Sequence, residues 1–231
     1  MEQDQSKVLL VEGAGDEGVI KEILNAWNVP CPCIKACGSD AQVFQALKLY
    51  LSNPGQYKTI GVIVDADINP GGRLQRFAQV LNVSKRYRLD ENNPLIAEGL
   101  ITDGVVVDAA RVGLWVMPDN QSHGMLEDFL AAMADTAHPE LMVESESAIS
   151  NIESKGLQQY TPRHRPKAKI HTYLAWQKDP GSTLPQAIQK HYLDVSSENA
   201  RPFVSWISRL FWEKQANYQY PLCQNNNPKT N

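Results

Sequence analysis

The stretch Thr59-Ile60-Gly61-Val62-Ile63-Val64-Asp65-Ala66-Asp67 decides how the rest of the chain can fold. Its apolar residues follow one another without alternation, which is typical of a central parallel strand covered on both faces. Side chains alternate along a strand, so Asp65 and Asp67 are predicted to point the same way. Two carboxylates that converge at a strand end repel each other unless a cation or a proton lies between them. The stretch therefore predicts a divalent-metal site.

Strand and helix patterns alternate on both sides of this stretch. A short apolar strand is expected at 7–11, and the glycine-rich turn at 13–18 leads into a helix with one apolar face. The segments that follow are a strand at 34–37, a helix at 40–51, the strand that ends at Asp67, a helix after Asn69, a strand at 113–119 and a helix at 124–134. Such an order is typical of a parallel sheet wrapped by helices, so the predicted fold class is α/β.

The chain divides into three parts by composition. Residues 1–137 carry the α/β pattern, with an insertion at about 82–108 that includes a predicted hairpin around Asp103 and Gly104. Residues 138–223 form a helical C-terminal region without clear strands, and the polar segment 224–231 is expected to be disordered. The sequence leaves three roles open for the C-terminal helices: a lid, a homodimer surface, or a docking site for a partner.

Charge and cysteine content limit the class of protein. The chain has 231 residues, with 22 Lys and Arg against 26 Asp and Glu, so any polyanion must be held by a local basic patch or through metal. The four cysteines are Cys31, Cys33, Cys37 and Cys223. Their crowding does not match a secreted disulfide framework, and burial is favoured over a zinc cluster because no second spaced pair completes one. The polar N-terminus and the lack of a membrane-length apolar run predict a soluble, cytoplasmic protein without a membrane partner.

Acidic residues follow three of the predicted strands. Glu12 follows the first, the Asp65 and Asp67 pair follows the third, and Asp119 follows the strand at 113–119. In open α/β sheets ligands bind beyond the carboxyl ends of the strands, so acids far apart in sequence can gather in one crevice. The alternative is that each acid simply begins a polar loop. The Asp-x-Asp spacing at the end of a central strand favours metal for the set.

The turn Gly13-Ala14-Gly15-Asp16-Glu17-Gly18 also satisfies the G-x-G-x-x-G dinucleotide template, with Asp40 at a tolerable distance for a ribose partner. A pyrophosphate at this turn would face Glu12, Asp16 and Glu17. Such crowding of negative charge is unfavourable without a cation, so a nicotinamide cofactor is disfavoured. The same acids suit a phosphate site that is bridged by Mg²⁺.

Two of these motifs resemble a known family. Val11-Glu12-Gly13 with Asp16 on the first strand, followed by Asp65-Ala66-Asp67 on the third, resembles the Toprim domain of topoisomerases, bacterial primases, OLD-type nucleases and recombination mediator proteins. The segment from Met117 to Asp128 is similar to a Toprim-like family close to the OLD-type nucleases. The resemblance covers roughly residues 7–135, and it implies a Toprim-like (Rossmann-like) parallel sheet flanked by helices, with a C-terminal helical extension.

The resemblance also implies roles for the matching residues. Glu12 would be the general acid or base or an additional metal ligand, and Asp65 and Asp67 would hold Mg²⁺ or Mn²⁺. Asp16 and Asp119 would support them or a second ion. Glu127 and Asp128 are neighbours on a helix and so diverge by about 100°. At most one can face the metal, and Glu127 occupies the family's acidic position. Acids near a helix N-terminus are also favoured by the helix dipole alone.

The densest positive run is Arg163-His164-Arg165-Pro166-Lys167-Ala168-Lys169-Ile170-His171. It could contact a phosphate backbone or stabilise negative charge in a transition state, or it could be a solvated loop. Lys169 is the candidate catalytic cation, because it lies beside an apolar helix that could direct it towards the site. His123 is a candidate ligand near Asp119, although a residue that starts a helix is the simpler reading.

Two functions are consistent with the sequence. The first is a metal-dependent nuclease or phosphodiester-processing enzyme that acts on DNA or RNA, with Asp65, Asp67, Asp16, Asp119 and Glu127 around the metal and Glu12 and Lys169 as catalytic groups. The second is a non-catalytic nucleic-acid-binding or regulatory subunit. An ATPase partner is expected in that case, since OLD-type Toprim domains are commonly associated with ATPases and this chain has no P-loop.

Overall fold

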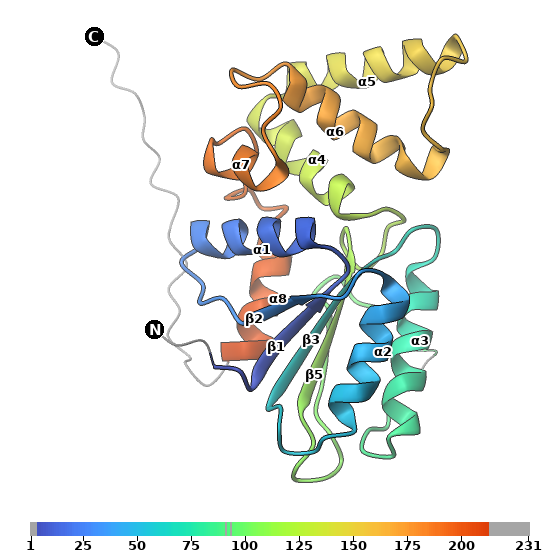
Figure 1. Ribbon diagram of the computed structural model, residues 1–231, viewed down its shortest axis with the longest axis vertical. Coiled ribbons are helices and arrows are strands. Elements are labelled where there is room, and N and C mark those ends of the chain that lie inside the picture. Colours follow the sequence, from blue (N-terminus) through green and yellow to red (C-terminus); the bar gives the residue numbers. More distant parts are fainter. Residues whose placement is uncertain (1–3, 91, 93, 213–231) are drawn as a thin grey trace.

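The computed structural model describes residues 4–90, 92 and 94–212 of the chain. Figure 1 shows strands and helices alternating through the first half and helices alone in the second. The elements are β1 (Lys7–Val11), α1 (Ala14–Ala26), β2 (Cys33–Ala36), α2 (Asp40–Leu51), β3 (Thr59–Asp65), α3 (Pro70–Val83), β4 (Leu100–Thr102), β5 (Arg111–Met117), α4 (Leu126–Ala137), α5 (Pro139–Ser154), η1 (Pro162–His164), α6 (Arg165–Ala175), α7 (Leu184–Gln189) and α8 (Arg201–Trp212).

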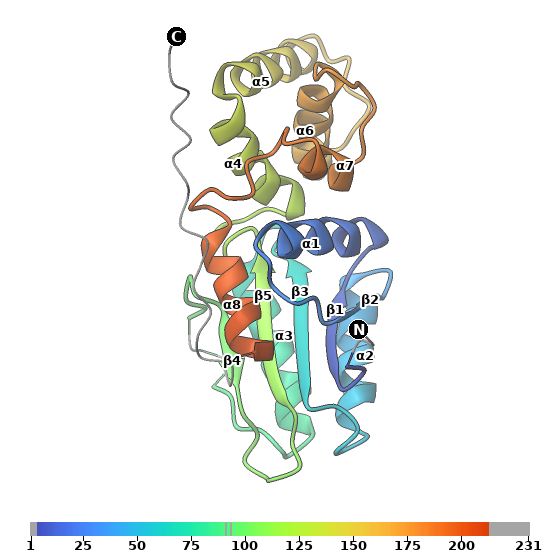
Figure 2. The same cartoon turned by 90° about the vertical axis from the view of Figure 1, so that its left-hand side faces the viewer.

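The strands form one five-stranded sheet in the order β2-β1-β3-β5-β4. All neighbours are parallel except β4, which pairs antiparallel with β5. Helices α2 and α3 cover one face, and α1 and α8 cover the other (Figure 2). The α/β fold class is therefore confirmed, and the architecture is Rossmann-like.

Local sequence explains the strands and helices well. Every residue of β3 before Asp65 is buried, as an uninterrupted apolar run covered on both faces predicts. On α1 the buried residues Val19, Ile20, Ile23 and Leu24 share one face. The first turn of α2 is capped by the side chain of Ser39, which accepts a hydrogen bond from the backbone N–H of Gln42. Hydrophobic periodicity and capping together therefore predict these elements correctly.

Two glycines bring the last helix close to the sheet. Gly61 on β3 and Gly113 on β5 are register partners, and each would clash with α8 if it carried a Cβ. A Cβ on Gly61 would lie 2.9 Å from Cζ of Phe211, and one on Gly113 would lie 2.7 Å from Cδ2 of Leu210. The C-terminal part of the chain thus returns to the sheet and shares one apolar cluster with it.

Helices α4, α5, α6 and α7, with the short η1, form a group that we call the helical lobe (residues 126–189). The lobe lies beyond the carboxyl ends of β3 and β5 (Figure 2). Its contact with the sheet domain runs largely through α1, because α1 packs against α7. The lobe is therefore placed over the edge of the sheet at which the acidic residues were predicted to gather.

The remaining predictions have mixed outcomes. Strand β4 pairs antiparallel with β5, so a hairpin does begin at Asp103, but its connection extends over 103–110 and its second strand lies outside the predicted insertion. Cys31, Cys33 and Cys37 are free thiols, and each is half-buried rather than fully buried as expected. Cys223 and the tail at 224–231 lie outside the described residues. Among the described helices, none has both the length and the apolar character needed to cross a membrane.

Candidate functional site

The first two site residues meet where the direction of winding of the sheet reverses. From β1 the chain proceeds to β2 on one side and then crosses to β3 on the other, so the carboxyl ends of β1 and β3 flank a crevice. Glu12 follows β1 and Asp65 ends β3. Oε1 of Glu12 accepts a hydrogen bond of 2.9 Å from the backbone N–H of Asp65. Two acids separated by 53 positions in the chain are thereby held side by side.

Two further acids complete what we call the acid cluster (Glu12, Asp16, Asp65 and Glu127). Asp16 belongs to the first turn of α1, and its Oδ2 accepts a hydrogen bond of 2.6 Å from the backbone N–H of Gly13. Glu127 belongs to the first turn of α4 and is only 7% exposed. The side chains of Glu12, Asp16 and Asp65 line a cavity of about 10 Å³, close to the volume that one water molecule needs.

The electrostatics of the cluster favour a bound cation or proton. Burial raises the pKa of Asp65 to about 8, and repulsion from Glu12, Asp16 and Glu127 adds to the effect. Burial also raises the pKa of Glu12, and so does repulsion from Asp40 and Asp16. The pKa of Asp16 is raised by burial first and by Glu127 next. Because these shifts reinforce one another, the cluster cannot ionise fully at neutral pH without a positive ion.

Asp67 does not join the acid cluster. Strand β3 ends at Asp65, and Asp67 has a left-handed backbone with φ of +53°, so the alternation expected of a continuing strand does not apply to it. Its backbone instead pairs with Gly124, where N–H to O distances of 2.8 and 2.9 Å join the loop after β3 to the loop before α4. The carboxylate of Asp67 is turned towards arginines.

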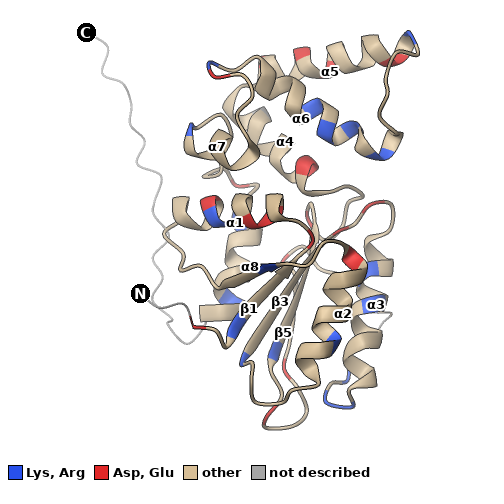
Figure 3. Ribbon diagram, viewed as in Figure 1, with Lys and Arg blue, Asp and Glu red and all other residues tan. Residues whose placement is uncertain are grey.

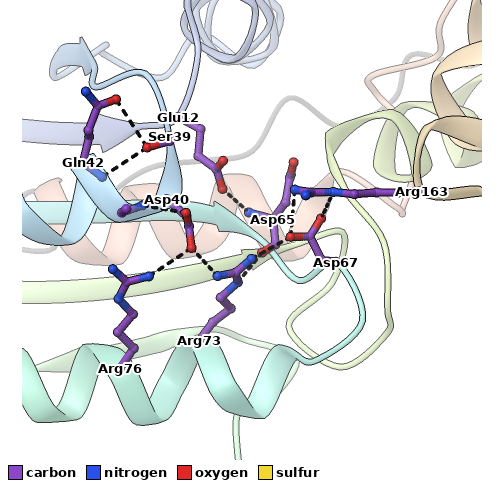
Figure 4. A network of polar contacts seen from close by, with 10 residues as sticks. Glu12, Ser39, Asp40, Gln42, Asp65, Asp67, Arg73, Arg76 and Arg163 are labelled. Carbon is purple, nitrogen blue, oxygen red and sulfur yellow. Dashed lines mark hydrogen bonds and ion pairs between the residues drawn. The ribbon is translucent and has the colours of Figure 1, made fainter. Parts of the chain in front are cut away.

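Three arginines surround Asp67 and its neighbour Asp40 (Figure 4). Arg73 donates to Oδ2 of Asp67 at 2.7 Å, to the backbone carbonyl of Asp65 at 2.9 Å, and to Asp40. Arg163 pairs with both carboxylate oxygens of Asp67. Its Nε lies 2.9 Å from Oδ1, and its Nη2 lies 3.0 Å from Oδ2. Arg76 adds a second bond to Asp40 at 3.1 Å. Guanidinium groups thus occupy the position that the sequence assigned to metal at Asp67.

A pocket of about 550 Å³ opens on the other side of Asp67. It lies between the loop after β3, the loop before α4, and η1 with the start of α6. Its lining residues are Asp67, Ile68, His123, Gly124, Met125, Asp128, Pro162, Arg163 and Pro166. The pocket therefore combines an apolar wall with a few charged groups, as ligand sites commonly do.

The basic run at 163–169 faces the acids of the sheet domain and of α5. In Figure 3 the Lys and Arg positions of α6 lie towards the Asp and Glu positions at the starts of α1 and α4. Each of its four cations has an acidic partner: Arg163 pairs with Asp67, Arg165 with Glu146, Lys167 with Glu127 at 3.6 Å, and Lys169 with Glu146 at 3.3 Å. The cations of this run therefore form ion pairs with acids of the same chain, and the run is not a free basic patch.

Several residues predicted for the site lie elsewhere. Asp119 is exposed and caps its own turn, accepting bonds from the backbone of Gln121 at 3.0 Å and Ser122 at 2.6 Å. Although burial alone would raise the pKa of Asp119, these bonds lower it overall. Lys169 is paired with Glu146 on α5, and it is Lys167 that reaches the acid cluster, through Glu127. His123 lines the large pocket.

Glu127 and Asp128 diverge as their helical spacing predicts. Glu127 lies within electrostatic range of Asp16 and Asp65, whereas Asp128 lines the large pocket. Oδ2 of Asp128 accepts a hydrogen bond of 2.9 Å from the backbone N–H of Met125, which caps α4. The structure therefore places Glu127, and not Asp128, beside the acids at the strand ends.

Sequence reasoning did not find Arg73. This residue is 17% exposed and joins the ends of α2, β3 and the loop after β3 through Asp40, Asp65 and Asp67. One arginine three residues into a helix has no distinctive sequence signal. Its partners become apparent only when the carboxyl ends of the parallel strands are brought together.

The acid cluster fits a hard divalent cation by chemistry, because all of its donor atoms are carboxylate oxygens. Within residues 4–90, 92 and 94–212, however, no three Asp, Glu, His or Cys side chains converge closely enough to hold a metal ion as they stand. Each of Glu12, Asp16 and Asp65 binds a backbone N–H through one oxygen, which leaves the other to turn towards an ion. Holding a metal ion here would therefore require these side chains to rotate from their present positions.

The dinucleotide alternative loses its main support in the structure. A pyrophosphate at the start of α1 would meet the carboxylate of Asp16, which already caps Gly13. Asp40, the candidate ribose partner, is bound by Arg73 and Arg76. The turn at Gly13 and the acid Asp40, which the dinucleotide template requires, are therefore already bound by other side chains of the chain.

Comparison with known proteins gives one match. The family described as "Protein of unknown function (DUF3226)" matches residues 6–212. The comparisons with curated proteins and with solved structures gave no match. Because the matched segment includes the whole sheet, the acid cluster and the helical lobe, the chain belongs to the DUF3226 family.

Proposed function

We propose that this protein is a divalent-metal-dependent enzyme that cleaves or otherwise processes phosphodiester bonds in DNA or RNA, with a Toprim-like active site close to that of the OLD-type nucleases. One observation carries the proposal: Glu12, Asp16 and Asp65 meet at the reversal point of a Rossmann-like sheet, where burial and mutual repulsion raise the pKa of Asp65 to about 8. Such a cluster needs a cation, and its oxygen donors match Mg²⁺ or Mn²⁺.

Asp65, Asp16 and Glu127 are the residues that would hold the ion, and their side chains would have to rotate to do so, since no three acids among the described residues converge closely enough as they stand. A bound divalent ion would polarise a phosphate oxygen and make a water molecule more acidic. Asp67 can join this set only when a guanidinium group leaves it, because Arg73 and Arg163 both bind its carboxylate. Asp119 would need its loop to rearrange.

Glu12 is the proposed general acid or base. Its Oε1 is fixed by the backbone N–H of Asp65, so its other oxygen is the one that can exchange a proton. Burial raises the pKa of Glu12 above its ordinary value, which makes its carboxylate a stronger base than an exposed one. The function of Glu12 is thus to take a proton from an attacking water or to give one to a leaving oxygen.

Cations of the helical lobe would stabilise the phosphate. Lys167 lies 3.6 Å from Glu127, and Arg163 lies at the edge of the large pocket. Lys169 lies two residues further along α6, and its charge attracts the carboxylate of Asp128. It would therefore act on the phosphate indirectly, through Asp128. These groups can offset negative charge that develops on a phosphate during cleavage.

A cleavage assay tests this proposal. Purified protein is incubated with Mg²⁺ or Mn²⁺ and with single-stranded, nicked and duplex substrates of both DNA and RNA. We expect Asp65→Asn and Glu12→Gln to lose at least about a hundredfold in rate. Asp119→Asn is the matched control, since it removes one acid outside the cluster and keeps the oxygen that caps its turn. Cleavage by Asp65→Asn at the wild-type rate would show that the assignment is wrong.

The alternative is a non-catalytic, nucleic-acid-binding or regulatory subunit that would work with an ATPase partner or as a homodimer. It is favoured by the absence of a ready coordination set among the described residues and by the pairing of the basic run with acids. Calorimetric titration with Mn²⁺ separates the two functions. No binding at millimolar concentration supports the subunit, whereas binding that Asp65→Asn abolishes supports the enzyme.

We place the protein in the cytoplasm as part of this proposal. The support is chemical: Cys31, Cys33 and Cys37 are free thiols with partial exposure, which suits a reducing compartment. Fractionation of cells that express the chain from its own promoter would test the location.

A further inference from the structure

The large pocket beside Asp67 has features that the proposed metal chemistry does not require. Its volume is about 550 Å³, which lies within the usual range for small-ligand pockets. Met125, Pro162 and Pro166 form part of an apolar wall, and Ile68 extends into solvent with 83% of its surface exposed. Ile68 thus adds an exposed aliphatic group to the rim of the pocket, beside its apolar wall.

Arg163 is an exposed cation at the edge of this pocket. Its side chain is 61% exposed and reaches from η1 to both oxygens of Asp67. Arg73, by contrast, is 17% exposed and is held by Asp40 and by the carbonyl of Asp65 as well as by Asp67. If Arg163 leaves, Asp67 therefore keeps Arg73 on Oδ2, and its buried Oδ1 loses its ionic partner.

The planar fork of an arginine matches a phosphate group as well as it matches a carboxylate. A phosphate that enters the pocket can therefore replace Asp67 as the partner of Arg163. Asp67 would still be paired with Arg73, and Arg163 would be paired with the phosphate. The flat base attached to that phosphate has an apolar wall on which to lie. Bases inside a duplex are stacked on their neighbours and cannot reach such a wall, whereas those of a single strand can.

We propose that this pocket binds one unstacked nucleotide of a single-stranded nucleic acid and that Arg163 passes from Asp67 to the phosphate of that nucleotide. The inference rests on the proposed function and names its substrate class. The base lies against Ile68, Pro162 and Pro166, and the phosphate lies at the Asp67 edge of the pocket.

This exchange has a consequence for the metal. Arg163 competes with a divalent ion for Asp67, so a bound strand frees Asp67 to take part in metal binding. Binding of nucleic acid and of metal are then mutually favourable, and by thermodynamic linkage each strengthens the other by the same factor. A bound strand would thus leave Asp67 with Arg73 as its guanidinium partner and with Oδ1 open to a divalent ion.

The first test measures binding of a fluorescently labelled twelve-nucleotide oligothymidylate by anisotropy in EDTA, where no metal chemistry contributes. We expect Arg163→Ala to weaken binding about tenfold and Ile68→Ala to weaken it about threefold. Arg86→Ala is the control for the arginine, since Arg86 also pairs with a single aspartate, Asp108, outside this pocket. Val107→Ala controls for the loss of an exposed aliphatic side chain. Both controls should stay within about twofold of wild type.

The second test is a calorimetric Mn²⁺ titration without nucleic acid. Arg163→Ala should bind Mn²⁺ more tightly than wild type, because Asp67 has lost a competing cation, while Arg86→Ala should not. Arg163→Ala is thus expected to weaken oligonucleotide binding and to strengthen Mn²⁺ binding. A merely structural effect would not change the two affinities in opposite directions.

Three results would overturn the inference: equal oligonucleotide binding by wild type and Arg163→Ala, no binding by wild type, or equally tight binding of a duplex of the same length. Mn²⁺ affinity that is equal in wild type and Arg163→Ala would overturn the exchange at Asp67. If no variant binds Mn²⁺, the metal-dependent function fails, and the measurements in EDTA still decide whether the pocket holds a strand.

Discussion

Oε1 of Glu12 accepts a 2.9 Å hydrogen bond from the backbone N–H of Asp65, and this bond sets one carboxylate against the end of the strand that carries another. Oδ1 of Asp65 in turn accepts a 3.0 Å bond from the backbone N–H of Leu126 at the start of α4. The acid cluster is thereby fixed by backbone atoms from both the sheet and the helical lobe. These hydrogen bonds fix the geometry of the acid cluster, and the negative charge of its carboxylates still has to be balanced by a cation or a proton.

Asp65→Asn should stabilise the metal-free protein, and the gain should grow with pH. The pKa of Asp65 rises from 3.8 to about 8 on folding, so the protonated acid favours the folded state. That contribution is complete below about pH 4 and is lost as the pH rises through about 8. Asparagine has no proton to lose and still offers an oxygen to Leu126. Between pH 5 and pH 8 the advantage of the variant should grow by ~3.5 kcal/mol, or roughly 7–14 °C in a chain of this size.

Thermal unfolding in EDTA at several pH values measures this effect. Asp119→Asn is the flat control: hydrogen bonds lower the pKa of Asp119, so its contribution is lost only below its ordinary pKa and should not change between pH 5 and pH 8. A difference between Asp65→Asn and wild type that does not change from pH 5 to pH 8 would contradict the electrostatic description of the cluster.

Gly61→Ala should destabilise the fold by about 1–3 kcal/mol, because the added Cβ has no room. It would lie 2.6 Å from Cδ1 of Leu9 and 2.9 Å from Cζ of Phe211, between the sheet and α8. Gly15→Ala provides the matched control, since nothing lies within 4 Å of the added Cβ on α1. The control should gain about 0.4–1 kcal/mol from the stiffer unfolded chain. Urea unfolding measures both, and equal stability of the two variants would show that α8 does not pack on β3 as described.

Arg165→Ala should loosen the helical lobe without unfolding the sheet domain. Arg165 bonds to both oxygens of Glu153 at 3.0 and 3.1 Å and pairs with Glu146, so it fastens α6 to α5. The hydrogen bond from Arg165, and then that from Lys169, lowers the pKa of Glu146 to about 2. We expect a loss of about 1 kcal/mol, seen as faster amide hydrogen exchange at 139–175.

Lys21→Ala is the comparison for this variant, because Lys21 forms an exposed helical ion pair with Glu17. Such pairs contribute about 0.3–0.5 kcal/mol, so the exchange pattern of the lobe should not change. Equal exchange rates at 139–175 in Arg165→Ala and wild type would show that the α5 to α6 contact depends on apolar packing instead.

The sequence by itself determined the elements of this protein, because their signals are local. The apolar run at 59–64, the helical face of α1 and the caps of α2 each depend on residues within a few positions of one another. The order of these elements was also enough to predict a parallel sheet with acids at its carboxyl edge. The meeting of Glu12 with Asp65 follows from that order.

Only the tertiary structure decided which acids face one another. Asp67 leaves the acid cluster because β3 ends two residues earlier and its backbone turns to pair with Gly124, and Asp119 leaves it by capping its own turn. Arg73 and Arg163 reach Asp67 from positions 6 and 96 residues away in the chain. The partners of long polar side chains are determined by proximity and charge in the folded backbone. Spacing along the sequence therefore does not reveal those partners.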